Sequence, residues 1–414
     1  MALWLAAGLV ALPLWASPQA SAVAAQDAEP VPQASAFKVD GGGLAWRSTD
    51  GEYEIRLRGL LQGDGRFYSG ADDTFLWRTA RPIIEGTLAG RVDFRLTPEL
   101  AGSGTNIVDA YADLRLGGGH ALRIGKFTSP VGLERLQSSS SLPMMERSTA
   151  SELAPNRDIG LQLQGRLRWQ QASYAFGVFY GSVDGRDVVA SNPDDRYEWA
   201  GRLFLEPFRG QENAWSGLGF GIGASTGDTV GAGNDYLPRY RSAGQKQFFS
   251  YRADVAAAGR RTRISPQGYY YRDRFGLMAE YVVSRQRVGN SDARATLDNR
   301  AWEATASYVL TGEAASYKGV KPAWPVKPGT GNWGAFELVG RYGVLDVDDD
   351  AFPLYADPAV AAGEASTRLV GVNWYLTGNF KLVLNYLETR FEGAAANGDR
   401  ADERAVFVRA QMAY

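Results

Sequence analysis

Apolar and polar residues alternate with a period of two along most of this chain. In YEIRLRGLLQGDGR, residues 53–66, Ile55 and Leu57 fall on one face, whereas Arg56 and Arg58 fall on the other. Successive side chains of a β-strand point to opposite faces of the sheet, so this period predicts strands and not helices. A sheet with one apolar and one charged face buries the apolar face in lipid or in a protein core and turns the other face toward water. The pattern therefore constrains the chain to an all-β fold.

Sixteen segments share this pattern, and the links between them mostly alternate between short and long. Short turns on one rim and long loops on the other are typical of bacterial outer-membrane barrels, so we predict a transmembrane antiparallel β-barrel of sixteen strands. One link breaks the alternation. Residues 313–332 stand where a short turn is expected, which indicates either an elaborated turn or an error in the strand count. The predicted strands are 53–66, 76–89, 90–97, 107–116, 120–127, 158–169, 171–182, 195–206, 217–226, 260–271, 274–286, 299–311, 332–343, 366–377, 379–390 and 404–414.

The two ends of the chain fit export to an outer membrane. Residues 1–25 contain an apolar run that ends in small residues, with an A-x-A-like site at Ala22–Ala24, and predict a signal peptide, although no Lys or Arg precedes the run. Residues 26–50 are predicted to be a periplasmic lead-in, and residues 51–414 one barrel domain. The chain has no cysteine, and no later stretch reaches the roughly 18 apolar residues of a membrane helix. Tyr414 ends an alternating strand, and a terminal aromatic of this kind is what the outer-membrane assembly machinery recognises.

The segment TSPVGLERLQSSSSLPMMERSTASELAPNRD, from Thr128 to Asp158, has neither a helical nor a strand period. A long irregular segment inside a sheet-rich chain is usually functional or disordered. This segment carries Arg135, Arg147 and Arg157 among small and apolar residues. We predict that it is a third loop that folds into the barrel and narrows it. The alternative is an ordinary surface loop.

Arginine dominates the basic residues, because only seven of the 44 are lysine. A guanidinium is always charged and binds phosphate or carboxylate oxygens two at a time, and a series of such groups would pass an anion from one to the next. The alternative is that wall carboxylates such as Glu54, Asp64 and Asp109 neutralise the arginines, as in many porins. The predicted anion-binding, pore-lining residues are Arg56, Arg58, Arg66, Arg78, Arg81, Arg91, Arg95, Arg135, Arg147, Arg157, Arg261 and Arg263.

The sequence predicts no enzyme, metal site or cofactor. His120 is the single histidine and lies in a glycine-rich turn, so no nucleophile has an evident base. The acidic run DVDDDAF, residues 346–352, lacks the glycine and distal glutamate of a calcium loop. We predict that this run is solvated and contacts lipopolysaccharide through divalent cations. Nothing in the sequence indicates binding of nucleic acid.

Several stretches resemble the phosphate-selective porin O and P family of Gram-negative outer membranes. The most specific are IGKFTSPVGLERLQSSSS (124–141), APNRDIGLQLQGRL (154–167) and GAFELVGRYGVLD (334–346). The resemblance implies a sixteen-stranded barrel that forms a homotrimer and takes up anions, with phosphate or polyphosphate favoured over other small anions. We expect lipopolysaccharide and phospholipid as its membrane partners. It places Arg135 where the family's third loop presents a basic residue. A second family lysine is replaced here by Ser138–Ser141, which favours a broader anion pore. A general or sugar-type porin and a purely structural or adhesive barrel plugged by its loops are the alternatives.

Overall fold

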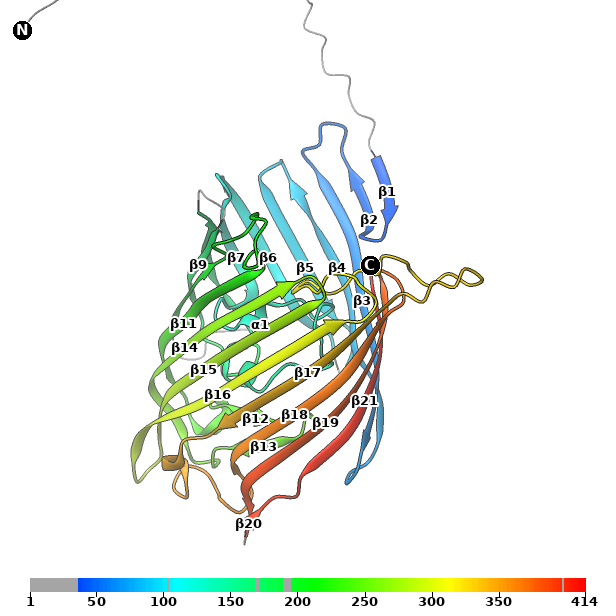
Figure 1. Cartoon of the computed structure of the whole chain (residues 1–414). Coiled ribbons are helices and arrows are strands. Elements are labelled where there is room, and N and C mark those ends of the chain that lie inside the picture. The colour runs from blue at the N-terminus through cyan, green and yellow to red at the C-terminus, as the bar shows by residue number, and fades with distance from the viewer. Residues whose placement is uncertain (1–35, 103, 168–170, 189–194, 397) are drawn as a thin grey trace, which may run out of the picture.

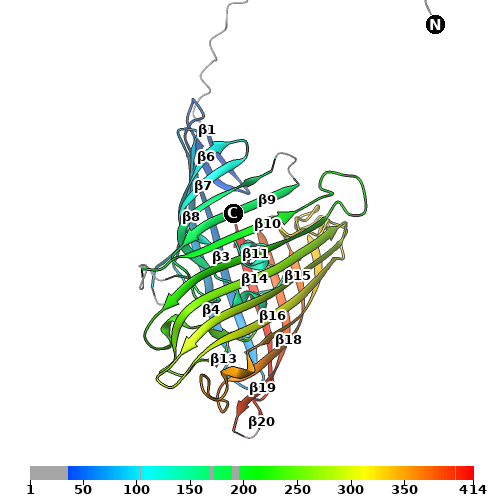
Figure 2. The ribbon, with the colours of Figure 1, turned by 90° about the vertical axis from the view of Figure 1, so that its left-hand side faces the viewer.

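The structure is a computed structural model that describes residues 36–102, 104–167, 171–188, 195–396 and 398–414. The predicted signal peptide, residues 1–25, lies outside the described residues. Sixteen antiparallel strands form one closed barrel, which Figures 1 and 2 show from two sides. Each predicted strand is present, with boundaries that differ by a few residues, so the predicted fold is confirmed. No helix in the described ranges is long and apolar enough to span a membrane.

The barrel closes because the last strand pairs with the first. β21 runs antiparallel to β3 from Ala405 opposite Tyr68 to Ala413 opposite Leu60. The strands of the barrel, in order around the wall, are β3 (Glu54–Tyr68), β4 (Thr74–Leu88), β5 (Val92–Glu99), β6 (Asn106–Gly117), β7 (His120–Thr128), β8 (Arg157–Arg166), β9 (Ala172–Phe179), β10 (Glu198–Leu205), β11 (Leu218–Val230), β14 (Ala256–Arg272), β15 (Phe275–Gly289), β16 (Arg294–Val309), β17 (Ala335–Asp346), β18 (Ala362–Tyr375), β19 (Phe380–Ala395) and β21 (Glu403–Ala413).

The two faces of the wall have the predicted chemistry. Along β15, Leu277 and Tyr281 are exposed on the outside, while Glu280 and Ser284 are buried on the inside. Large apolar side chains stand free on the outer face, with Phe75 at 78% exposed. An outer band of this kind is covered by lipid in a membrane barrel. The wall therefore separates a hydrocarbon environment from a polar interior.

A hairpin that the sequence did not reveal precedes the barrel. β1 (Ala36–Asp40) pairs with β2 (Gly43–Arg47), and β2 continues the wall by pairing with β3, with Leu44 opposite Leu57. Gly43 has φ +105°, and a Cβ there would lie 2.2 Å from the Leu57 carbonyl oxygen. Only glycine fits that approach. The second half of the predicted lead-in is thus part of the sheet at the short-turn rim (Figure 1).

Two long loops pack inside the barrel. The third loop, residues 129–156 between β7 and β8, carries α1 (Leu133–Leu136) and α2 (Ala150–Leu153), and Leu133, Met144 and Leu153 within it are buried. The prediction that it folds inward is confirmed. The fifth loop, residues 231–255, was not predicted to fold inward. Its elements are η1 (Gly233–Tyr236), β12 (Arg239–Arg241) and β13 (Gln247–Ser250), and Tyr240 and Phe249 lie in a large buried apolar cluster.

The anomalous link between β16 and β17 is an elaborated turn, since the strand count of sixteen holds. Part of it reaches into the barrel from the short-turn rim and meets the third loop. The Tyr317 hydroxyl donates to the Leu133 carbonyl at 2.6 Å, and Gln137 Nε2 donates to the Tyr317 carbonyl at 2.7 Å. The remaining short elements, η2 (Asp349–Ala351) and β20 (Gly398–Asp399), belong to loops on the opposite rim.

Candidate functional site

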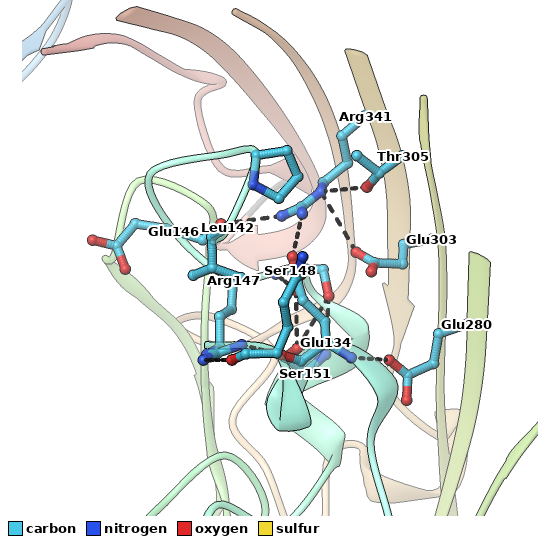
Figure 3. Close-up of polar contacts among 12 residues, drawn as sticks. Glu134, Leu142, Glu146, Arg147, Ser148, Ser151, Glu280, Glu303, Thr305 and Arg341 are labelled. Atoms are coloured by element: carbon cyan, nitrogen blue, oxygen red, sulfur yellow. Dashed lines mark hydrogen bonds and ion pairs between the residues drawn. The ribbon is translucent and has the colours of Figure 1, made fainter. Parts of the chain in front are cut away.

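A buried ion pair fixes the third loop to the barrel wall. Glu134 of α1 pairs with Arg341 of β17, and the exposed fractions of the two side chains are 0% and 2%. Arg341 also donates to Thr305 at 2.9 Å and to the Glu146 carbonyl at 3.1 Å. The other oxygen of Glu134 accepts from the Ser148 amide at 2.7 Å, which ties the two halves of the loop together (Figure 3). Such a network holds a loop in one position because every partner depends on the others.

The start of α1 is held by a second wall carboxylate. Glu280 of β15 accepts from the amides of Leu133 at 2.8 Å and Glu134 at 3.3 Å (Figure 3). These amides begin a helix and have no partner within it, so a carboxylate from the wall satisfies them. Ser265 donates to the same carboxylate at 2.7 Å. The wall therefore supplies the cap that the loop sequence itself lacks.

A third set of contacts fixes the far part of the loop to β3, β4 and β21. Glu146 pairs with Arg66 at 2.6 Å and with Arg78 at 2.9 Å. Arg409 pairs with Asp64 at 2.6 Å and donates to the Met145 carbonyl at 2.6 Å. Burial by itself would raise the pKa of Glu146, but Arg78, Arg409 and Arg66 together lower that pKa to about 2. The carboxylate therefore stays charged across the physiological pH range.

Two cavities remain open beside the anchored loop, and residues of β3–β8 and of the loop itself make up most of their linings. The extracellular cavity, of about 310 Å³, reaches the fifth loop through Arg241 and Gln245. The periplasmic cavity, of about 550 Å³, reaches the short-turn rim through Gly59 and Ala413. The two cavities share four lining residues, which define the neck between them. These are Arg81, Arg135, Ser139 and Arg157.

Three guanidiniums from three different elements therefore surround the neck, and each has an acidic partner. Arg81 of β4 pairs with Glu99 at 2.7 Å, and Arg157 of β8 pairs with Asp109 at 3.4 Å. Arg135 of α1 has its nearest carboxylate, on Glu152, at 3.7 Å. It is held mainly by the Ser151 carbonyl, to which Nε and Nη2 donate at 2.9 and 2.6 Å. A guanidinium has five N–H donors, so these contacts leave donors on each arginine for a passing anion.

Four more of the predicted arginines line one of the two cavities. Arg78 and Arg147 line the extracellular cavity, and Arg58 and Arg95 line the periplasmic cavity. Arg147 donates to the carbonyls of Glu134 and Gln137, and no carboxylate of the described residues lies within 4.0 Å of it. Its charge is thus less compensated than those at the neck.

The other five predicted arginines line neither cavity. Arg66 is buried beneath Glu146 and Asp64. Arg56 pairs with Glu54 near the rim, and Arg91 is exposed in the turn between β4 and β5. Arg261 and Arg263 are buried in pairs with Glu198 and, for Arg263, also with Asp184. At several of these positions an acidic side chain thus neutralises the arginine, as the alternative prediction expects.

Four basic residues that line the cavities are absent from the predicted pore-lining set. Arg241 and Arg409 line the extracellular cavity, and Arg123 and Lys318 line the periplasmic cavity. Lys318 lies in the elaborated turn, where its carbonyl accepts from Ser141 Oγ at 2.9 Å. The turn thus places a lysine beside the Ser138–Ser141 run. The anomalous length of the link between β16 and β17 was the one sequence signal that could have identified Lys318.

The described residues offer few groups suited to catalysis or metal binding. His120 Nδ1 lies 3.0 Å from the Tyr174 hydroxyl at the periplasmic rim. Among the described residues, no three His, Asp or Glu side chains could hold a metal ion together. Asp348 of the acidic run accepts from the backbone amides of Asp298 and Asp350, which is a local structural role.

Comparisons with known proteins agree with this geometry. A model of the family described as phosphate-selective porin O and P matches residues 56–414. Porin O of Pseudomonas aeruginosa is 26% identical over 412 residues, which cover 90% of this chain and 91% of that protein. The outer-membrane channel DcaP of Acinetobacter baumannii has a TM-score of 0.56 at 11% identity, over 89% of this chain and 99% of its own. OmpT of Vibrio cholerae, solved in a trimer form, has a TM-score of 0.54 at 10% identity, over 87% of this chain and 99% of its own. The two structures show a common barrel fold.

Proposed function

The chain belongs to the phosphate-selective porin O and P family, and from that premise we propose that it is an outer-membrane channel for passive uptake of anions, with phosphate or polyphosphate favoured. That it is a porin of the Gram-negative outer membrane follows from the family and the fold. The choice of solute is the proposal.

One observation carries it. Arg81, Arg135 and Arg157 line both cavities, so a solute that moves from one cavity to the other passes close to all three. An anion that sheds water in a narrow passage needs donors that replace its hydration, and forked guanidiniums supply them in pairs. Cations are disfavoured at the same place, because a like charge at about 4 Å costs about 1 kcal/mol in water and about 4 kcal/mol at an effective dielectric constant near 20.

A second candidate, a porin with weak ion selectivity, is favoured by the acidic partners. Glu99, Asp109 and Glu152 each face one arginine of the neck. Alternating charges of this kind set a field across a pore and can pass neutral solutes. The Ser138–Ser141 run adds no charge of its own. The two candidates differ in one measurable quantity, the permeability ratio of chloride to potassium.

Single-channel recording in planar bilayers tests the proposal. We expect a reversal potential in a KCl gradient that indicates chloride preference, and block of the chloride current by millimolar phosphate. Arg157→Gln should lower both the chloride preference and the block by phosphate. Arg285 lies on the exposed outer face, paired with Asp298, so Arg285→Gln should change neither quantity. A wild-type channel that prefers potassium, or is indifferent to sign, would reject the anion proposal in favour of the second candidate. A channel that conducts nothing would indicate a plugged barrel.

Assembly belongs to the same proposal. We expect a homotrimer in lipopolysaccharide and phospholipid, which the trimer form of OmpT supports through its shared fold. Cross-linking of the protein in outer-membrane vesicles, followed by electrophoresis without heating, would reveal a band of three times the monomer mass.

A further inference from the structure

A second polar recess opens beside the periplasmic cavity. This alcove has a volume of about 430 Å³ and lies between the β7–β10 wall and the start of the third loop. It shares Arg123, Thr128 and Leu136 with the periplasmic cavity, so a solute that has passed the neck can enter it. It does not share any of the four neck residues.

The charges that line the alcove have one sign. Its fourteen lining residues in the described part of the chain include Arg123, Arg166 and Arg202 but neither Asp nor Glu. The extracellular cavity, in contrast, is lined by four carboxylates, and the periplasmic cavity by one. The other polar lining side chains are neutral hydrogen-bonding groups, namely Thr128, Gln162, Gln164, Ser173 and Tyr174. Such a lining attracts anions without offering a competing negative group.

Arg202 is the alcove arginine that has no acidic partner among the described residues. Arg123 is held by Asp113 through two hydrogen bonds of 2.7 Å, and Arg166 pairs with Glu206 at 3.2 Å. For Arg202, no carboxylate of the described residues lies within 4.0 Å; its Nε donates to Gln267 Oε1 at 2.8 Å. Up to four N–H donors thus remain on this guanidinium, on the two terminal nitrogens that form its fork.

Two neighbouring side chains hold the Arg202 guanidinium in position. The guanidinium carbon of Arg202 lies 4.2 Å from the centre of the Phe204 ring, which covers one face of the group. Gln267, which accepts from Arg202, also donates to the Val131 carbonyl of the third loop at 2.7 Å. A preorganised guanidinium loses little freedom when an anion binds to it.

We propose that the alcove is a second anion site, at which Arg202 binds a phosphate-type oxyanion on the periplasmic side of the neck. The inference rests on the proposed function, because the inhibition can be measured only in a channel whose neck passes chloride. A tetrahedral oxyanion would accept from the Arg202 fork, with Gln164 and Ser173 as further donors. Because the alcove adjoins the path, a bound phosphate there would repel chloride in the periplasmic cavity. Phosphate added from the periplasmic side should therefore inhibit the chloride current through this site.

The test is one-sided inhibition of single-channel chloride current by inorganic phosphate. Arg202→Gln should raise the half-inhibiting concentration from the periplasmic side about tenfold, equivalent to about 1.4 kcal/mol. It should change inhibition from the extracellular side less, because phosphate added there must first pass the neck. Gln164→Glu, which brings a carboxylate into the alcove and keeps Arg202, should act in the same direction. Arg47→Gln, which removes an exposed arginine of β2 at the same rim, is the matched control and should match the wild type.

The outcomes separate the two proposals. If periplasmic inhibition is the same in the wild type and in both alcove variants, the alcove site is wrong, whatever the neck does. If the wild type shows no chloride preference, the proposed function fails independently of the alcove. Migration of unheated protein in electrophoresis shows whether each variant has formed its barrel, and two variants at different residues keep the test decisive if one does not fold.

Discussion

Arg341 of β17 and Glu134 of the third loop form an ion pair whose side chains are 2% and 0% exposed. The pair lies in the barrel interior and joins a wall strand to a loop that is 207 residues earlier in the chain. Glu303 of β16 is a second carboxylate near the same guanidinium, at 3.6 Å. One arginine thus lies close to two buried acids at the base of the loop that shapes the pore.

Removal of one partner should loosen the loop. Glu134→Gln leaves the loop amides with an acceptor but leaves Arg341 with only the more distant Glu303 as a buried acidic partner. Breaking a buried pair typically costs about 3–5 kcal/mol. We expect a lower unfolding temperature and frequent fluctuations of the open-channel current, measured by thermal scanning in detergent and by single-channel recording. The double variant Glu134→Gln/Arg341→Met should regain part of the lost stability. If the single variant matches the wild type in both measurements, the pair does not anchor the loop.

The elaborated turn should steady the loop from the periplasmic side. Tyr317→Phe removes the hydrogen bond to the Leu133 carbonyl, which is worth about 1 kcal/mol. We expect greater open-channel noise with little change in mean conductance. Tyr270→Phe is a matched control, because it removes a similar bond of 2.7 Å to the Ala214 carbonyl at the rim. Equal noise in the two variants would contradict a role for the turn in the pore.

The anchor at Glu146 should weaken only in strong acid. Its pKa is lowered from 4.5 to about 2, so its contribution to stability is present above pH 4.5 and is lost as the pH falls toward 2. A shift of that size corresponds to about 3 kcal/mol. We expect the unfolding temperatures of the wild type and Glu146→Gln to differ at pH 7 and to converge as the pH falls from about 4.5 to 2. A difference that stays constant over this range would show that the carboxylate is not the stabilising group.

Neighbouring variants at the neck should shift selectivity in opposite directions. Glu99 pairs with Arg81 and also accepts from the Ala80 and Ala101 amides, so it stays in place when the arginine is changed. One unit charge at about 4 Å is worth about 1 kcal/mol in water. Arg81→Gln should therefore lower the chloride-to-potassium permeability ratio about fivefold, and Glu99→Gln should raise it. Reversal potentials in a salt gradient measure both. Shifts of the same sign would mean that the neck does not select by charge.

The alternating pattern located the barrel because the wall has lipid on one face and a polar interior on the other. Even β16 was found, although the predicted range 299–311 starts later than the observed Arg294–Val309. The inward fold of the third loop could be predicted, because its length and its arginines stand out between two clear strands.

Other features depend on partners far away in the sequence. Phe248 and Phe249 of the fifth loop are buried in the same apolar cluster as Leu297 and Ala301, and no local period in the sequence predicts that packing. Arg261 and Arg263 have the same alternation as Arg58, but their partners Glu198 and Asp184 lie 63 and 79 residues earlier. Alternation indicates which face an arginine occupies. Whether its charge is free depends on tertiary neighbours that the pattern does not record.

The pairing of β21 with β3 also determines when this molecule can be completed. The seam includes the final residues, with the Gly59 amide bonded to the Tyr414 carbonyl at 2.9 Å. Until the C-terminal strand arrives, β3 presents a row of unsatisfied amides and carbonyls to hydrocarbon, which no spanning segment tolerates. Shortening the chain at this end would thus yield an unsealed sheet and not a narrower pore. Closure of the wall is in this sense a single event, which requires β21.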